Sequence, residues 1–309
     1  MNDAFRIMNY LFIDWQPHVE AFQIASYSVR WYALLWAVGL VAAYYVVKNL
    51  YKHQGISLDK FDPLFLYCFF GILIGARLGH CLFYEPEYYL GSTNGVIEMF
   101  LPIKIQPDGS WQYHGYAGLA SHGGAIGCFI AMFIYSRRNA VRFTVVLDNV
   151  CIATPLTASC IRFGNLMNSE IIGSQTDVPW AFVFHTNESM VGGAAVPRHP
   201  AQLYEALAYF LIFIVLLVVY WRLKRYKIRS GVGTGLYFGL CLTLIFTFRF
   251  FVEFIKKEQV DFEKGMPLDM GQLLSIPFII AGIYFTIRGI RLIKKYRNDH
   301  ESYLKAYGE

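Results

Sequence analysis

The stretch FFGILIGARLGHCLF (69–83) places one arginine, Arg77, inside a segment that is otherwise apolar enough to lie in lipid. Two further stretches share this pattern: TPLTASCIRFGNLM (154–167), with Arg162, and LTLIFTFRFFVEF (242–254), with Arg249. A charged side chain near the centre of a bilayer costs roughly 2.5–3.5 kcal/mol on insertion scales, so intramembrane arginines are usually paired or functional. We therefore expect these arginines to hold something anionic.

The composition of the chain is typical of a membrane protein. Its 309 residues are 56% hydrophobic and 16% charged, whereas soluble domains are about 25% charged. A helix needs about 20 apolar residues to cross a hydrocarbon core of about 30 Å. We predict an all-α, polytopic membrane protein with about seven transmembrane helices, at approximately 28–48, 62–84, 117–136, 143–162, 202–221, 232–254 and 271–290.

The positions of the lysines and arginines predict the orientation of the chain. If the first span runs from outside to inside, the inside regions hold 17 of the 27 cationic residues, the outside regions seven and the spans three. This asymmetry follows the positive-inside rule and predicts an N-out, C-in topology. We attribute the net charge of +5 to this topology and to contact with anionic membrane lipids, and we expect no nucleic-acid partner.

The chain is expected to form a single membrane-embedded domain over residues 1–309. Two outer segments, 85–116 and 163–201, exceed the roughly 12–15 residues beyond which a loop is usually functional or disordered. Because both are rich in Gly, Pro, Trp and Asn, we expect ordered caps over the outer leaflet. The six cysteines show no metal-ligand spacing, so we expect neither a metal site nor a disulfide framework.

The second and third expected spans carry glycines, an arginine and a histidine. Three glycines recur every four residues, as in a helix-packing face: Gly71, Gly75 and Gly79. Arg77 lies off that face, where it either binds a lipid headgroup or pairs with a carboxylate. His122 opens the third span and could accept a proton near pH 7, while Gly123 would let a substrate approach the backbone. The alternative role for His122 is that of a hydrogen-bonded anchor.

The fourth expected span carries polar residues near both ends. Asp148, near its inner end, is expected to snorkel or to pair. The outer end reads RFGNLMNSE (162–170). Guanidinium forks match phosphate oxygens, and Asn side chains both donate to and accept from hydroxyl groups. This density of polar groups favours a ligand site over ordinary helix capping, with four candidates: Arg162, Asn165, Asn168 and Glu170.

Two glutamates lie in or beside the last expected spans. RHPAQLYE (198–205) opens the fifth span, and a buried Glu205 needs a cationic partner, for which Arg162 or Arg249 would serve. Structural pairing and site lining both remain open for Glu205. Arg249 and Glu253 lie four residues apart on one helix face, so they either neutralise each other or serve a ligand.

Taken together, these motifs resemble one family, the bacterial prolipoprotein diacylglyceryl transferases. The resemblance runs through Trp31-Tyr32, HGGAIG (122–127), RFGNLMNSE (162–170), RHPAQLYE (198–205), RFFVEF (249–254) and MGQLLSIP (270–277). It implies an enzyme of the bacterial cytoplasmic (inner) membrane that moves the diacylglyceryl group of phosphatidylglycerol onto the lipobox cysteine thiol of a prelipoprotein signal peptide. Glycerol 1-phosphate would be released, and no metal or other cofactor is implied.

The resemblance also implies roles for individual residues. Arg162 and Arg249 would stabilise the negative charge that develops on phosphate. His122 would take the proton of the cysteine thiol, whose ordinary pKa is about 8.5. Substrate-binding or positioning roles would fall to Tyr32, Arg77, Gly123, Asn165, Asn168, Glu170, His199, Glu205 and Glu253. Many family members carry a tyrosine where this chain has Ile245, so any role of that phenol is in doubt here.

An alternative class is a non-enzymatic protein that binds or transports anionic lipids with the same arginines. Such a protein predicts inverted repeats and broken helices at mid-membrane. The sequence instead gathers its polar residues near the outer ends of the expected spans, which favours the transferase.

Overall fold

The computed structural model describes residues 12–24, 27–106, 108–113, 115, 118–225, 230–257 and 267–296. Contacts between Cα atoms divide the chain into two compact units, the first formed by residues 1–50 and 147–308 and the second by residues 51–146. A single domain over the whole chain stays a prediction. Residue 117 of the third expected span, and the basic residues Lys227, Arg229, Arg297 and Lys305 of the expected inner regions, lie outside the described residues.

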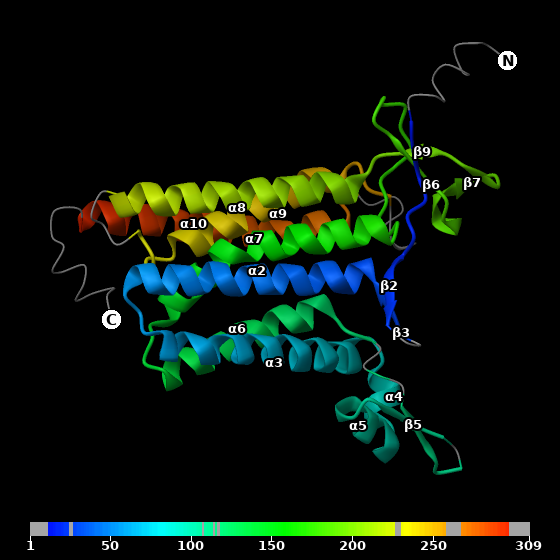
Figure 1. Ribbon diagram of the computed structural model, residues 1–309, viewed down its shortest axis with the longest axis horizontal. Helices are drawn as coiled ribbons and strands as arrows, with labels where there is room; N and C mark the ends of the chain where they lie inside the picture. The colour runs from blue at the N-terminus through cyan, green and yellow to red at the C-terminus, as the bar shows by residue number, and fades with distance from the viewer. Residues whose placement is uncertain are drawn as a thin grey trace. The chain divides into compact units, whose positions relative to one another are not determined.

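Helices of 18 residues or more dominate the described chain (Figure 1): α2 (Trp31–Gln54), α3 (Leu58–Phe83), α6 (Ser121–Arg138), α7 (Phe143–Met167), α8 (Ala201–Arg225), α9 (Leu236–Glu253) and α10 (Met270–Lys295). Among the described residues, six of these helices are long and apolar enough to cross a membrane. The prediction of a mostly helical, multi-pass membrane protein is therefore confirmed.

Helix α6 coincides with the third expected span but does not meet the criterion that the other six satisfy. Its 18 residues begin with Ser121 and His122 and end with Arg137 and Arg138. At a rise of about 1.5 Å per residue, such a helix is about 27 Å long, close to the thickness of a hydrocarbon core. A seventh span at α6 stays a prediction.

Short strands accompany the helices, a feature that the prediction of an all-α chain did not include. In the first unit, β1 (Ile13–Trp15) pairs in parallel with β6 (Phe182–Phe184), which pairs antiparallel with β9 (Pro197–Arg198). The remaining strands form three hairpins: β2 (Glu20–Ile24) with β3 (Tyr27–Arg30), β4 (Ile103–Ile105) with β5 (Trp111–Tyr113), and β7 (Met190–Val191) with β8 (Ala194–Ala195).

The three-stranded sheet packs against the end of α7. Phe182 and Phe184 of β6 form a buried cluster with Leu166 of α7, and Trp15 and Leu203 pack against it. The indole N–H of Trp15 donates to the carbonyl of Leu166 at 3.0 Å. This packing fixes the end of α7, through Leu166, and the start of α8, through Leu203.

In the second unit, α3 and α6 meet along glycines. A Cβ atom on Gly71 or Gly75 would overlap the backbone of Gly127 or Gly123, and a Cβ on Gly79 would lie 2.8 Å from the Cα of Gly123. The expected packing role of the α3 glycines is thus confirmed, and it follows the small-residue pattern of membrane helix pairs. The space beside Gly123 is taken by α3, which differs from the expectation that it admits a substrate.

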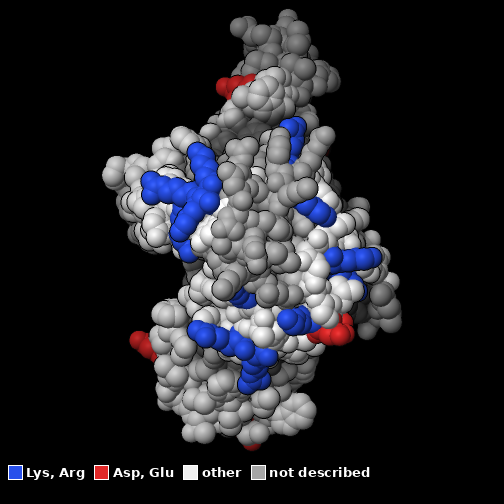
Figure 2. All heavy atoms as spheres, turned by 90° about the vertical axis from the view of Figure 1, so that its left-hand side faces the viewer, with Lys and Arg blue, Asp and Glu red and all other residues white. Residues whose placement is uncertain are grey.

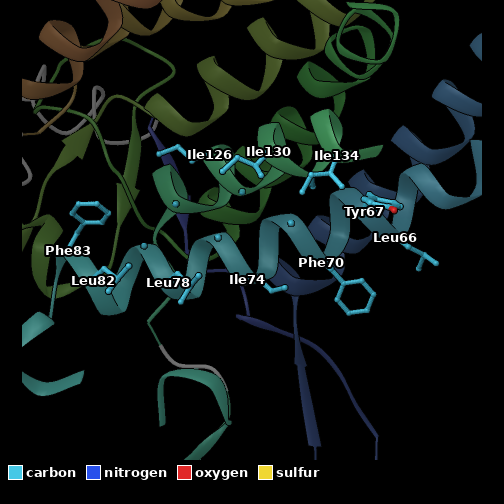
Figure 3. A pocket seen from close by; sticks show the side chains of 16 residues that line it. Leu66, Tyr67, Phe70, Ile74, Leu78, Leu82, Phe83, Ile126, Ile130 and Ile134 are labelled. Atoms are coloured by element: carbon cyan, nitrogen blue, oxygen red, sulfur yellow. The ribbon is translucent and has the colours of Figure 1, made fainter. Parts of the chain in front are cut away.

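An apolar groove of about 620 Å³ runs along the α3–α6 contact. Figure 3 shows Phe70, Ile74 and Leu78 of α3 on one side of it and Ile126 and Ile130 of α6 on the other. Among the described residues, none of the side chains that line this groove is charged. Its lining is what a helix pair presents to lipid tails, so the polar chemistry of the chain lies elsewhere.

The second unit also contains two short helices, α4 (Pro86–Leu90) and α5 (Thr93–Phe100), which follow α3 and precede β4. Ser92 caps α5 by accepting a hydrogen bond from the N–H of Gly95 at 3.0 Å. Together with the β4–β5 hairpin, these helices give the described part of segment 85–116 regular secondary structure, and its role as an outer cap stays a prediction.

Helix α9 begins at a buried carboxylate. One carboxylate oxygen of Asp148 accepts from the N–H groups of Gly233 and Gly235, and the other accepts from the N–H of Phe238, each at 2.9 Å. Gly235 precedes the helix with φ of 85°, a conformation that favours glycine. Asp148 is fully buried. Asp148 therefore does not snorkel. It has the expected pairing role, and its partners are the otherwise unpaired N–H groups at the start of α9.

Basic side chains gather at the ends of helices. Figure 2 faces the end of the molecule at which α8 and α10 finish, and Lys and Arg side chains are frequent on that face. The first unit contributes cations from the C-terminal parts of α2, α8 and α10: Lys48, Arg222, Lys224, Arg288, Arg291, Lys294 and Lys295. This is the pattern on which the N-out, C-in prediction depends.

Candidate active site

The end of α7 places the first site residues. Arg162 lies one turn before the helix ends at Met167. A Cβ on Gly164 would lie 2.9 Å from the ring of Tyr32 and 3.1 Å from its Cα, so glycine lets the start of α2 approach α7 closely. Tyr32 therefore lies beside the RFGNLMNSE segment, although the two are far apart in sequence.

The polar residues of this segment form one hydrogen-bonded chain. A terminal nitrogen of Arg162 donates to the amide oxygen of Asn165 at 3.2 Å, and the Asn165 amide nitrogen donates to Glu170 at 3.3 Å. The amide nitrogen of Asn168 donates to the other Glu170 oxygen at 3.1 Å. Arg162, Asn165, Asn168 and Glu170 are thus brought together, as the density of polar groups in the sequence indicates.

Glu205 is the buried partner of Arg162. The Arg162 Nε atom lies 3.1 Å from Glu205 Oε2, and the Glu205 side chain is 0% exposed. Among the described residues, Oε2 accepts no hydrogen bond of good geometry. We therefore treat the Arg162–Glu205 contact as an ion pair whose N–H does not point at the oxygen.

A lysine that sequence reasoning placed among the outer-region cations completes this cluster. Lys256 Nζ lies 3.1 Å from Glu205 Oε1 and 2.8 Å from Glu253 Oε2, and its side chain is only 4% exposed. Tyr209 also donates to Glu205 Oε1, at 3.1 Å. The signal that could have revealed Lys256 is its spacing of three residues from Glu253, which permits an ion pair at the end of a helix.

Arg249 lies in the same neighbourhood without an acidic partner. Its neighbour in the chain, Phe248, packs edge-on against the Tyr209 ring with 6.2 Å between ring centres, and Tyr209 donates to Glu205. Within the part of the chain that the structure describes, no ion pair or hydrogen bond of Arg249 is found. The alternative in which Arg249 and Glu253 neutralise each other is wrong, because Glu253 pairs with Lys256.

Glycines and backbone hydrogen bonds fix the cluster in place. A Cβ on Gly271, at the start of α10, would overlap the Glu253 carboxylate. Beyond α9, the N–H of Ser174 donates to the carbonyl of Ile255 at 2.8 Å, and the N–H of Lys257 donates to the carbonyl of Ile172 at 3.2 Å. The segment after α9 is thereby tied to the segment after α7.

His199 anchors the start of α8. Its Nδ1 lies 3.2 Å from the Tyr204 hydroxyl, which also accepts from the indole N–H of Trp180 at 2.8 Å. Burial lowers the pKa of the His199 imidazole, which favours its neutral form. An indole N–H can only donate, so the Tyr204 proton is available to a neutral His199 Nδ1. These contacts give His199 a local partner, and its role in substrate binding stays a prediction.

The other two candidates belong to the second unit. His122 is the second residue of α6 and is exposed, and among the described residues no hydrogen bond joins it to a partner that would make it an anchor. Arg77 is buried; it donates to the carbonyls of Met99 and Glu98 at 3.2 and 2.7 Å and lies 5.0 Å from the centre of the Tyr89 ring. Arg77 thus holds the last turn of α5, so the structure favours a structural role for it.

Comparison with known proteins identifies the family. The family model for prolipoprotein diacylglyceryl transferase matches residues 19–288 of the chain. The chain belongs to this family. It is 55% identical over 275 residues to the phosphatidylglycerol–prolipoprotein diacylglyceryl transferase of Bacteroides fragilis, with 89% of this chain and 94% of the relative covered.

Two further members of the prolipoprotein diacylglyceryl transferase family, with the same printed name, show how far the likeness extends. The Chloroherpeton thalassium protein is 39% identical over 284 residues, covering 92% of this chain and 96% of its own. The Porphyromonas gingivalis protein is 39% identical over 289 residues, covering 91% and 95%. Because nearly the full length of each relative is matched, the chain is a membrane-embedded transferase of this family.

Proposed function

We propose that the protein transfers the diacylglyceryl group of phosphatidylglycerol to the lipobox cysteine of a prelipoprotein. In this reaction the cysteine sulfur forms a bond with the glycerol carbon next to phosphate. The bond between that carbon and its phosphate oxygen breaks, the oxygen keeps the electron pair, and the thiol proton is taken up by a base. The products are a thioether-linked lipoprotein precursor and glycerol 1-phosphate.

The observation that carries the proposal is the charge balance of the buried cluster. Glu205 and Glu253 are neutralised by contacts with Lys256 and Arg162, while Arg249 lies close by without an acidic partner among the described residues. Within the set Arg162, Arg249, Lys256, Glu205 and Glu253, one positive charge is therefore in excess, while the exposed Glu170 is held by the amides of Asn165 and Asn168. A phosphodiester carries a single negative charge, so phosphatidylglycerol fits this balance, and the charge that grows on the leaving phosphate would be stabilised further.

The remaining candidates receive supporting roles in this proposal. Asn165, Asn168 and Glu170 offer amide and carboxylate groups to the hydroxyls of the glycerol headgroup, beside Tyr32. His122 is proposed as the base that removes the thiol proton. Lipid-binding roles for Arg77, Gly123 and His199 have less support, because each already contacts its own part of the fold.

The transfer assay tests this function directly. Purified protein is incubated with vesicles of phosphatidylglycerol and a synthetic lipobox peptide, and the peptide is examined by mass spectrometry. We expect a mass gain of one diacylglyceryl group on the cysteine. A folded protein that binds phosphatidylglycerol vesicles but leaves the peptide mass unchanged would instead support the alternative of a non-enzymatic lipid-binding protein.

We also propose about seven spans in the cytoplasmic membrane, N-out and C-in, with the 163–201 segment outside. The proposal is supported by the basic residues at the ends of α2, α8 and α10 and by the length of α6. Single cysteines at Asn187 and Arg222, both exposed, are expected to react with an impermeant thiol reagent from opposite sides of the membrane in a cysteine-free background. Labelling of both from the same side would contradict this topology.

A further inference from the structure

We infer that Lys256 is a positioning residue, which occupies the two buried carboxylates and so leaves Arg162 and Arg249 available to the phosphate of the lipid. This inference rests on the proposed function. It assigns Lys256 no contact with substrate. Its effect is exerted through the glutamates and, through them, on the arginines.

The Lys256 ammonium contacts both buried carboxylates. Its nitrogen lies within hydrogen-bond distance of Glu205 Oε1 and Glu253 Oε2 at once, at 3.1 and 2.8 Å. The Glu205 and Glu253 side chains are 0% and 11% exposed, so solvent screens these charges little. An ammonium has three donors on one atom, which suits it to bridge two carboxylates that approach from different helices. Lys256 thus links α8 to α9.

Without Lys256, the nearest acidic partner for Arg249 would be Glu253. Arg249 and Glu253 lie one helical turn apart on α9, the spacing at which arginine and glutamate readily pair. A guanidinium can bind both oxygens of a carboxylate in the same fork geometry with which it binds phosphate. If Lys256 did not hold Glu253, the Glu253 carboxylate would compete with the lipid phosphate for Arg249.

Glu205 presents the same competition to Arg162. The Nε of Arg162 faces Glu205 Oε2, while one of its terminal nitrogens donates to Asn165. Lys256 and Tyr209 share the other oxygen of Glu205. Because Lys256 and Tyr209 occupy Oε1, Arg162 contacts Glu205 through Nε alone. Its terminal nitrogens stay outside the ion pair, and Arg162 needs them to bind phosphate.

Backbone hydrogen bonds on both sides of Lys256 fix its position. Lys256 forms an isolated antiparallel bridge with Gly173, which lies just beyond the RFGNLMNSE segment. Hydrogen bonds on either side, from Ser174 to Ile255 and from Lys257 to Ile172, continue the pairing. A Cβ on Gly173 would lie 2.4 Å from the carbonyl oxygen of His199 and 2.9 Å from that of Ile255, so the close approach of these segments depends on glycine. The ammonium is therefore delivered to the carboxylates by a fixed main chain.

The test compares Lys256→Met, Lys256→Arg and the double variant Lys256→Met/Glu253→Gln in the phosphatidylglycerol and lipobox-peptide assay. We expect Lys256→Met to lower kcat/KM for phosphatidylglycerol by roughly 10–100-fold, the range seen when a residue that orients binding groups is lost. Lys256→Arg should retain most activity. The double variant should be about tenfold faster than Lys256→Met or more, because it removes the carboxylate that captures Arg249. The control is Lys104→Met, at an exposed position on β4 in the second unit, which should leave the rate unchanged.

Two readouts separate positioning from a merely structural role. The KM for phosphatidylglycerol should rise in Lys256→Met while the KM for the peptide stays near that of the parent protein. Circular dichroism and size-exclusion chromatography should report a folded protein in each variant. If Lys256→Met does not fold, the double variant Lys256→Met/Glu253→Gln tests the inference alone. A double variant that folds and turns over supports the inference, and one that folds without turnover contradicts it.

Three outcomes overturn the inference: a Lys256→Met rate equal to that of the parent, a double variant no faster than Lys256→Met, or equal rises in KM for both substrates. A parent protein that transfers nothing would instead count against the proposed function, so the two failures are distinguishable.

Discussion

Replacing Arg162 by lysine is expected to lower the rate of transfer by about 10²–10³-fold, the loss that typically follows removal of one donor to a developing anion. Lysine keeps the positive charge but has no planar fork, so it cannot face Glu205, Asn165 and a phosphate together. The protein should still accumulate, since a lysine can neutralise the buried Glu205. The measurement is the initial rate of diacylglyceryl transfer at matched protein levels in membranes.

Arg249→Lys is expected to give a loss of similar size, because lysine keeps the positive charge in excess but lacks the planar fork that binds two phosphate oxygens. Arg222→Lys, at the end of α8 where the basic residues gather, serves as the matched control and should be neutral. Normal turnover by both Arg162→Lys and Arg249→Lys would show that bidentate binding of phosphate is wrong and that these arginines act in structural pairing.

Replacing His122 by glutamine is expected to slow transfer by about 10²–10⁴-fold at pH 7, the usual contribution of a general base. Glutamine keeps a hydrogen-bonding amide but cannot take a proton near neutrality. The deficit should shrink as the pH rises toward 9.5, because the peptide thiol, with an ordinary pKa of about 8.5, then ionises without a base. The measurement is the initial rate from about pH 6 to 9.5 for the parent protein and the variant with one lipobox peptide.

His53→Gln, at the exposed end of α2, is the control for the His122 experiment and should follow the parent profile. A His122→Gln deficit that stays constant over the pH range, or a near-normal rate at pH 7, would show that His122 orients the substrate and that the thiol proton goes elsewhere.

Those parts of the fold and the site that depend on local sequence could be predicted. The long apolar runs predicted the helices, because the length of a membrane span is set by the bilayer. The glycines of α3 predicted a close helix contact, which α6 supplies. The network of Arg162, Asn165, Asn168 and Glu170 could be predicted because all four residues come from one stretch of nine residues.

The features that the sequence could not predict depend on contacts between distant residues. Lys256 reads as an exposed cation after a span, and only the fold brings it to Glu205, which lies 51 residues earlier. The sequence around Arg77 predicted an anionic partner, but Arg77 donates to main-chain carbonyls of α5. No composition pattern encodes such a contact. The short strands escaped prediction because two or three residues carry no usable periodicity.

The cap on α9 bears on the order in which the membrane protein is assembled. Asp148 leaves the ribosome 85 to 90 residues before the backbone N–H groups that it accepts from. Until α9 meets α7, the first N–H groups of α9 and the carboxylate of Asp148 each lack a partner, and in lipid such unpaired groups cost several kcal/mol. The carboxylate of α7 thus supplies the acceptor for the N–H groups of a helix that is synthesised later. In the finished protein, the first N–H groups of α9 stay paired only while α7 is packed beside them, so the two helices are coupled through one carboxylate.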